Sequence, residues 1–157
     1  MVNINDVLNA AIKFTLYHIN SRTNRFYLTL SDDIPEIFGK KQVLEHVFIT
    51  LILTSCQAIT SRDQSFTITT QFIDDLKYVE ISFMDGGSGI EEENINQDFL
   101  PSSSRSSIGQ KVDFEKENTK KVIREHDGEI EFNSTIDNSR IINIRLPIHE
   151  LDNIKNA

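Results

Sequence analysis

The sequence of 157 residues has a single cysteine, no tryptophan and no long apolar run. One cysteine, Cys56, excludes an internal disulfide, and its apolar helical surroundings predict a buried thiol in a reducing compartment. The most apolar window, residues 43–53, still contains Glu45, His46 and Thr50, so no segment qualifies as a membrane span. No charged start leads into an apolar stretch with a small-residue cleavage site, which argues against a secretory signal. We therefore expect a cytoplasmic segment without direct membrane contact.

Basic residues are outnumbered by acidic ones, which gives a formal net charge of -8. Nucleic-acid phosphates attract basic surfaces, so this balance argues against a nucleic-acid partner. A free nucleotide is not excluded, because its binding depends on local backbone donors and metal ions. The length is that of one domain, and 38% hydrophobic with 25% charged residues is ordinary for a globular chain.

Hydrophobic periodicity predicts three helices and five strands. The helices are expected at residues 5–19, 41–59 and 113–125, and the strands at residues 26–30, 65–72, 77–84, 129–134 and 140–146. His126-Asp127-Gly128 is expected to close the third helix as a glycine C-cap. Because few of these elements form βαβ units, we expect an α+β two-layer sandwich with helices on one face of a mixed, mostly antiparallel sheet. Residues 1–149 would form this domain and residues 150–157 a tail.

Several motifs occur in an order that resembles the ATPase domain shared by histidine kinases, DNA gyrase, Hsp90 and MutL. Asp85–Ile90 matches a DxGxG box, residues 44–55 follow the register of the asparagine helix, and Phe99–Pro101 occupies the place of the phenylalanine-proline box. Glu125–Ile130 is similar to the end of the ATP-lid helix, and Ile144–Pro147 to the closing strand. The histidine-kinase branch fits best over nearly the whole chain. The resemblance implies the Bergerat ATPase fold, with ATP and Mg²⁺ as cofactors.

The glycine box carries chemistry that agrees with this resemblance. A carboxylate at a strand end, Asp85, can accept a hydrogen bond from the exocyclic amine of adenine. Gly87 and Gly89 lack a Cβ, so the backbone can turn sharply and approach a flat base. The alternative is a plain strand-ending turn capped by Asp85. We also expect Phe83 to pack in the core and not to stack on a base.

The asparagine box departs from the family pattern. The family has two asparagines four residues apart on one helix face, and the second supplies an oxygen to Mg²⁺; here these places hold Thr50 and Thr54. Thr54 is our candidate metal ligand, although its hydroxyl reaches less far than an amide. The alternative is a helical threonine that bonds back to the preceding turn. Thr50 is assigned to packing.

The phosphate-binding part of the resemblance departs further. The GxGL motif should fall near residues 113–116, which contain Asp113 and Glu115 and no glycine. Acidic residues there interact favourably with the positive end of the helix dipole, and they repel phosphates. Gly109 is a candidate remnant of the motif, and Arg105 a candidate lid cation that meets a phosphate. The alternative for Arg105 is an exposed loop arginine.

No histidine is assigned as a phospho-acceptor. Kinases of this family phosphorylate a histidine on a separate dimerisation hairpin, and that hairpin is not among these 157 residues. A longer parent protein with a membrane anchor is compatible with this interpretation. The spacing of histidine, cysteine and acidic residues predicts no zinc site.

Three functions remain open at this point. The first is the catalytic domain of a two-component histidine kinase, with weakened nucleotide binding and a histidine-bearing dimerisation domain as partner. The second is a pseudokinase that binds a response regulator or another phosphotransfer partner. The third is a free-standing anti-sigma-factor kinase, which would need a better asparagine box. The enzymatic activity itself is left undecided by the degenerate boxes.

Overall fold

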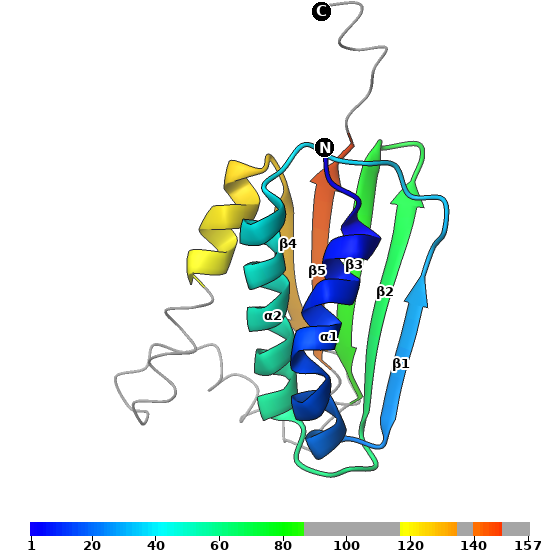
Figure 1. Cartoon of the computed structure of the whole chain (residues 1–157), viewed down its shortest axis with the longest axis vertical. Coiled ribbons are helices and arrows are strands. Elements are labelled where there is room, and N and C mark those ends of the chain that lie inside the picture. The colour runs from blue at the N-terminus through cyan, green and yellow to red at the C-terminus, as the bar shows by residue number, and fades with distance from the viewer. Residues whose placement is uncertain (87–116, 135–139, 149–157) are drawn as a thin grey trace, which may run out of the picture.

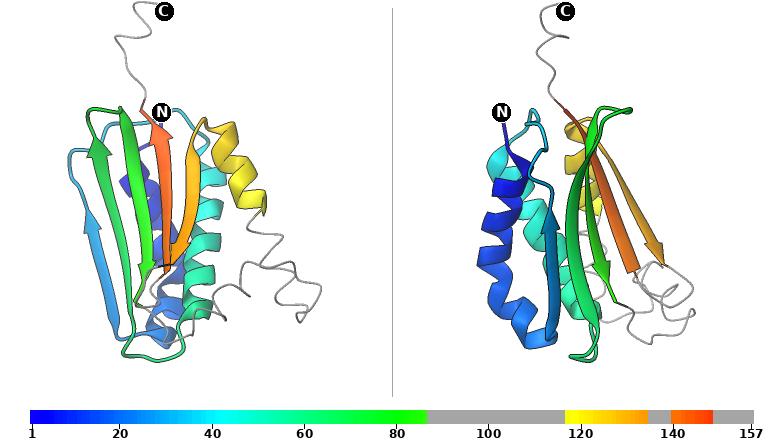
Figure 2. Two further views of the ribbon diagram at one scale, coloured as in Figure 1. Left: turned by 180° about the vertical axis from the view of Figure 1, so that it is seen from behind. Right: turned by 90° about the vertical axis from the view of Figure 1, so that its right-hand side faces the viewer.

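The computed structural model describes residues 1–86, 117–134 and 140–148, and these form two layers (Figure 1). One layer is a five-stranded sheet and the other consists of helices on one face of it (Figure 2). In chain order the elements are α1 (Ile4–Arg22), β1 (Arg25–Leu30), α2 (Lys41–Ala58), β2 (Ser65–Ile73), β3 (Tyr78–Asp85), a helix over residues 117–125, β4 (Glu129–Ser134) and β5 (Arg140–Pro147). The predicted α+β sandwich is confirmed.

The strand order is β1-β2-β3-β5-β4. Only the β1–β2 pair is parallel, and the other three pairs are antiparallel, as a mixed and mostly antiparallel sheet requires. Side chains alternate between the two faces of each strand. In β3 this alternation buries Val79, Ile81, Phe83 and Asp85 on the helix-facing side. One carboxylate, that of Asp85, thus lies on the same face of the strand as the apolar core residues.

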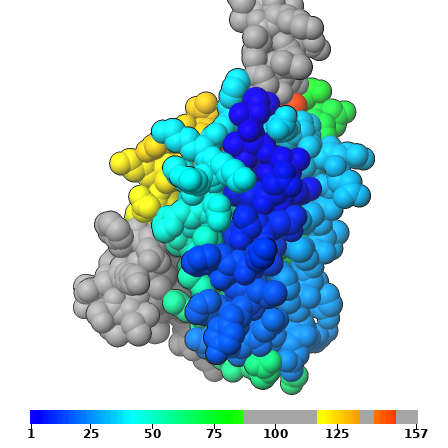
Figure 3. All heavy atoms as spheres, in the orientation of Figure 1, coloured from blue at the N-terminus to red at the C-terminus, as the bar shows by residue number. Residues whose placement is uncertain are grey.

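The two long helices pack side by side over the sheet, and their side chains form a continuous surface (Figure 3). The α1 helix begins at the N-cap Asn3, whose side chain accepts a hydrogen bond from the N–H of Asp6 at 3.1 Å. From α2, Phe48 packs on Phe83 of β3 with ring centroids 6.1 Å apart. Phe83 and Cys56 are both buried, as predicted. None of the described helices is long and apolar enough to cross a membrane.

The end of the helix over residues 117–125 differs from the predicted glycine C-cap. The left-handed residue is Asp127, with φ 59°, and not Gly128. Gly128 donates to the carbonyl of Ile123 at 2.9 Å and Asp127 to that of Arg124 at 3.0 Å, which are the two bonds of a Schellman motif. Gly128 is needed for a different reason, since a Cβ there would lie 2.5 Å from the carbonyl oxygen of Arg145. The expected glycine therefore serves close approach to β5.

Candidate functional site

The candidate site starts at Asp85, the last residue of β3. Its side chain points to the helix-facing side of the sheet and the residue is 4% exposed. Acidic side chains are seldom buried to this extent without partners. One partner is Arg140 at the start of β5, whose Nε lies 3.4 Å from the Asp85 Oδ2. A buried carboxylate thus lies at the end of a core strand, where the DxGxG box predicted it.

Gly86 follows Asp85 and has a steric reason to be glycine. Its N–H donates to the carbonyl of Ser65 at the start of β2. A Cβ at this position would lie 2.6 Å from the Ser65 backbone N and 2.9 Å from its carbonyl oxygen. No side chain fits between these backbones. Gly86 therefore fixes the path by which the chain leaves the sheet beside Asp85.

Thr50 and Thr54 lie half-buried on one flank of α2. Val43 precedes them by seven and eleven residues, separations that place each threonine within about 20° of Val43 around an α-helix. Val43 lines a pocket together with Glu125 and His126, so this flank of α2 faces the helix over residues 117–125. The Thr54 hydroxyl donates to the Thr50 carbonyl at 2.8 Å. This is the bond to the preceding turn that the sequence offered as the alternative to a metal ligand.

Asp85 and the threonine flank lie at the same end of the molecule, because α2 and β3 both run towards that end (Figure 1). The Phe48–Phe83 contact fixes their relative position. Thr54 lies six residues beyond Phe48, or about 9 Å along the helix. Asp85 lies two residues beyond Phe83, or about 7 Å along the strand. The Asp85 carboxylate and the Thr54 hydroxyl thus lie at the same end of the molecule.

Four predicted site residues lie outside the described residues: Gly87, Gly89, Arg105 and Gly109. Arg140 was not among the predicted site residues, and the structure brings it against Asp85. The sequence does indicate its position, because Arg140 lies two and four residues before the buried Ile142 and Ile144 in the same strand. Alternation alone would have placed this arginine on the inner face of the sheet.

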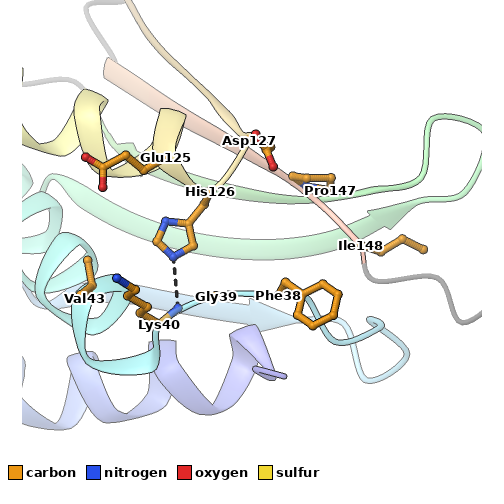
Figure 4. Close-up of a pocket in the computed structure, with 9 residues that line it drawn as sticks. All are labelled: Phe38, Gly39, Lys40, Val43, Glu125, His126, Asp127, Pro147 and Ile148. Carbon is orange, nitrogen blue, oxygen red and sulfur yellow. Dashed lines mark hydrogen bonds between the residues drawn. The ribbon is translucent and has the colours of Figure 1, made fainter. Parts of the chain in front are cut away.

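The opposite end of the molecule contains a pocket of about 620 Å³ (Figure 4). Phe38, Lys40 and His126 line it, together with Pro147 at the end of β5. Arg140, which marks the Asp85 end, lies seven residues earlier in β5, or about 23 Å away along an extended strand. The pocket is therefore separate from the candidate site. Within the described ranges no group of three or more His, Cys, Asp or Glu residues could hold a metal ion.

The chain is similar in sequence to a sporulation kinase and to a sensor protein. No protein-family model matches the sequence. Sporulation kinase E of Bacillus subtilis is 27% identical over 144 residues, which cover 87% of this chain and 18% of that protein. A protein of Shewanella frigidimarina named as a sensor protein is 26% identical over 142 residues, covering 87% of this chain and 20% of that protein. The chain spans about a fifth of the length of these relatives.

Solved structures with the same fold are catalytic domains of histidine kinases. The catalytic domain of histidine kinase ThkA superposes with a TM-score of 0.69 at 19% identity, covering 93% of this chain and 92% of that one. ThkA in complex with the response regulator TrrA gives a TM-score of 0.68 at 18% identity, covering 94% and 41%. Full-length ShkA in complex with AMPPNP gives 0.68 at 13% identity, covering 93% and 30%. The chain thus has the fold of a histidine-kinase catalytic domain, and the resemblance found in the sequence is confirmed.

Proposed function

We propose that this chain, whose fold is that of histidine-kinase catalytic domains, binds ATP weakly and serves a two-component pathway. The observation that carries the proposal is the buried carboxylate of Asp85 at the end of β3, on the same side of the sheet as α2. A carboxylate in such a place is costly to desolvate, so it is expected to have a task beyond packing.

The donor set at this end suits the base of a nucleotide. Adenine carries hydrogen-bond donors on its exocyclic amine, and a carboxylate is an acceptor with about four lone-pair directions. Gly86 holds the backbone beside Asp85 tightly against β2, which keeps the acceptor in a fixed position. We assign Gly87 and Gly89, which lie outside the described residues, to the close approach of the base.

The donor set suits Mg²⁺ less well. When bound, Mg²⁺ would supply positive charge that offsets the negative charge of the ATP phosphates. The Thr54 hydroxyl uses its hydrogen for the Thr50 carbonyl, which leaves its oxygen lone pairs for a metal. One neutral hydroxyl is a poor substitute for an amide oxygen with a longer reach. We therefore propose Thr54 as a weak metal ligand, with Arg105 and Gly109 as candidate phosphate contacts.

The partners we propose are suggested by two solved structures of the same fold. ThkA has been solved with the response regulator TrrA, and ShkA with AMPPNP. We propose that this domain delivers the γ-phosphate of ATP to a histidine on a separate dimerisation domain, and that a response regulator receives it next. No residue of the described part is assigned a catalytic role.

Titration calorimetry tests the proposal. ADP and ATP would be titrated into the protein with and without Mg²⁺, alongside Asp85→Asn. We expect weak binding that is lost in Asp85→Asn, because an amide offers one acceptor where a carboxylate offers two. The matched control is Glu80→Gln. Glu80 lies on the same strand but on the opposite face of the sheet, where it pairs with Arg145. Equal binding by Asp85→Asn and the parent protein would contradict the proposal.

A second candidate function is a pseudokinase that acts as a binding surface. Two observations favour it, the use of the Thr54 hydroxyl within α2 and the engagement of Asp85 with Arg140. Both reduce what the site offers to Mg²⁺-ATP. If the folded protein gives no heat with millimolar ADP or ATP, this alternative is preferred. Binding of a response regulator in the absence of nucleotide would then be its direct test.

A further inference from the structure

Asp85 and Arg140 form an ion pair across two strands. They are directly opposite each other in the antiparallel β3–β5 register. Each lies two positions along its strand from a core residue, Phe83 in β3 and Ile142 in β5, so both belong to the face of the sheet that carries the core. The two side chains are 5% and 15% exposed, and the Arg140 Nε lies 3.4 Å from the Asp85 Oδ2. The Arg140 guanidinium thus donates a hydrogen bond to the same carboxylate that we propose binds adenine.

The burial of this pair distinguishes it from the other strand-to-strand pair of the same two strands. Arg145 pairs with Glu80 at 3.2 Å, but the Arg145 side chain is 33% exposed. A pair withdrawn from water interacts more strongly, because the surrounding dielectric constant is lower. Hydrogen bonds between a guanidinium and a carboxylate are also stronger than those between neutral groups. Arg140 therefore competes with a bound base for the Oδ2 acceptor of Asp85.

We propose, on the basis of the proposed function, that Arg140 sets the base preference of this site. An adenine amine is a neutral donor, and it must share the Asp85 carboxylate with a charged donor. Arg140 therefore lowers the affinity of the site for adenine nucleotides. A guanine base carries a carbonyl oxygen where adenine carries the amine. That oxygen accepts hydrogen bonds, and a guanidinium has five N–H donors to offer. Arg140 thus narrows the difference in affinity between adenine and guanine nucleotides.

The experiment compares ADP with GDP by titration calorimetry on the parent protein and on Arg140→Gln. We expect the substitution to raise the affinity for ADP by roughly 5- to 10-fold, the net scale of one hydrogen bond from a neutral donor such as the adenine amine. The affinity for GDP is expected to stay the same or fall. Arg145→Gln is the matched control, because it removes the same charge from the same strand on the other face. It should leave both affinities within about twofold, as expected of a more exposed pair.

Two further variants keep the result interpretable. In Asp85→Asn/Arg140→Gln the gain in ADP affinity should disappear, since it acts through the carboxylate. If Arg140→Gln fails to fold, Arg140→Lys is used in its place. It keeps the positive charge beside Asp85 but replaces the forked guanidinium by a compact ammonium. The ratio of ADP to GDP affinity should rise in this variant in the same direction and by a smaller factor. Folding of each variant is checked by urea denaturation.

The outcomes separate the two proposals. If the parent protein binds ADP through Asp85 but the folded Arg140 variants show the same or weaker ADP binding and an unchanged base preference, the role of Arg140 is wrong and the proposed function stands. If neither the parent protein nor the folded Arg140 variants bind ADP or GDP, both proposals are overturned. A higher ADP affinity with a larger ADP-to-GDP ratio supports the role of Arg140.

Discussion

The imidazole of His126 joins the helix over residues 117–125 to the start of α2. Its Nε2 accepts a hydrogen bond from the N–H of Lys40, the N-cap residue of α2, at 3.1 Å (Figure 4). Its Nδ1 lies 2.9 Å from the carbonyl oxygen of Val122. A carbonyl only accepts, so Nδ1 carries the proton and the ring is held as the neutral Nδ1–H tautomer. The sequence predicted His126 only as part of the C-cap that closes this helix.

His126→Phe should destabilise the fold. The variant keeps an aromatic ring but removes the acceptor for the N–H of Lys40, and we expect the free energy of unfolding in urea to fall by about 1 kcal/mol. His46→Phe is the control, since His46 is exposed on α2 and should change stability by less than about 0.5 kcal/mol. Nitrogen NMR of the parent protein should show the Nδ1–H tautomer. The opposite tautomer would contradict the assigned hydrogen bonds.

Gly86→Ala should be strongly destabilising. The new Cβ would meet the backbone of Ser65, which cannot move without disturbing β2, and we expect a loss of about 1–3 kcal/mol in urea denaturation. The nearest atom to this Cβ is the Ser65 hydroxyl oxygen. Ser65→Ala removes that atom but leaves the backbone contacts. The double variant should therefore remain destabilised, and full rescue by Ser65→Ala would show that the backbone contact is unimportant.

Two residues in the described part have a left-handed backbone although they are not glycine, Lys77 and Asp127, each with φ 59°. Glycine adopts this conformation without the penalty of a Cβ, so Lys77→Gly and Asp127→Gly should each raise the unfolding free energy by up to about 1 kcal/mol. Lys77→Gly also removes an exposed ion pair with Asp74, which contributes little. Asp75→Gly in the same turn is the control. A similar gain there would attribute the effect to turn flexibility.

Burial raises the pKa of the Cys56 thiol to about 11, and nearby Arg22 opposes the shift. The folded state thus favours the neutral thiol more than the unfolded chain does. This contribution to stability is fully present below the pKa of the unfolded thiol and is lost as pH rises towards about 11. Stability should therefore decline more steeply above about pH 9 in the parent protein than in Cys56→Val. Cys56 should also react with a thiol reagent at pH 8 only as fast as the protein unfolds.

The sequence predicted the elements better than their ends and contacts. β4 was predicted with its exact bounds, because Ile130 and Phe132 alternate cleanly with polar residues. α1 runs three residues beyond the predicted Ile19. A distant side chain explains the extension, since Arg62 donates to the carbonyls of Asn20 and Ser21 at the end of the helix, each at 2.9 Å. A local pattern cannot contain such a partner 41 or 42 residues away.

The candidate site was predicted in the same uneven way. The strand-end position of Asp85 follows from local alternation and the glycines after it. Its contact with Arg140 joins residues 55 positions apart and depends on the β3–β5 register. That register is determined by packing of the whole inner face, which no single motif encodes. The ligand and the site contacts of the remaining predicted residues stay predictions.

The strength of Mg²⁺ binding should respond to the side chain at position 54. Thr54→Asn replaces a short hydroxyl by an amide whose oxygen reaches further from α2, so Mg²⁺ should strengthen ADP binding more in this variant than in the parent protein. Thr54→Val is the control, because it keeps the shape and removes the oxygen. Its ADP binding should be insensitive to Mg²⁺, while its unfolding free energy changes only by the loss of the bond to the Thr50 carbonyl. If Mg²⁺ strengthens ADP binding equally in all three proteins, the metal is held elsewhere and Thr54 has only a structural role.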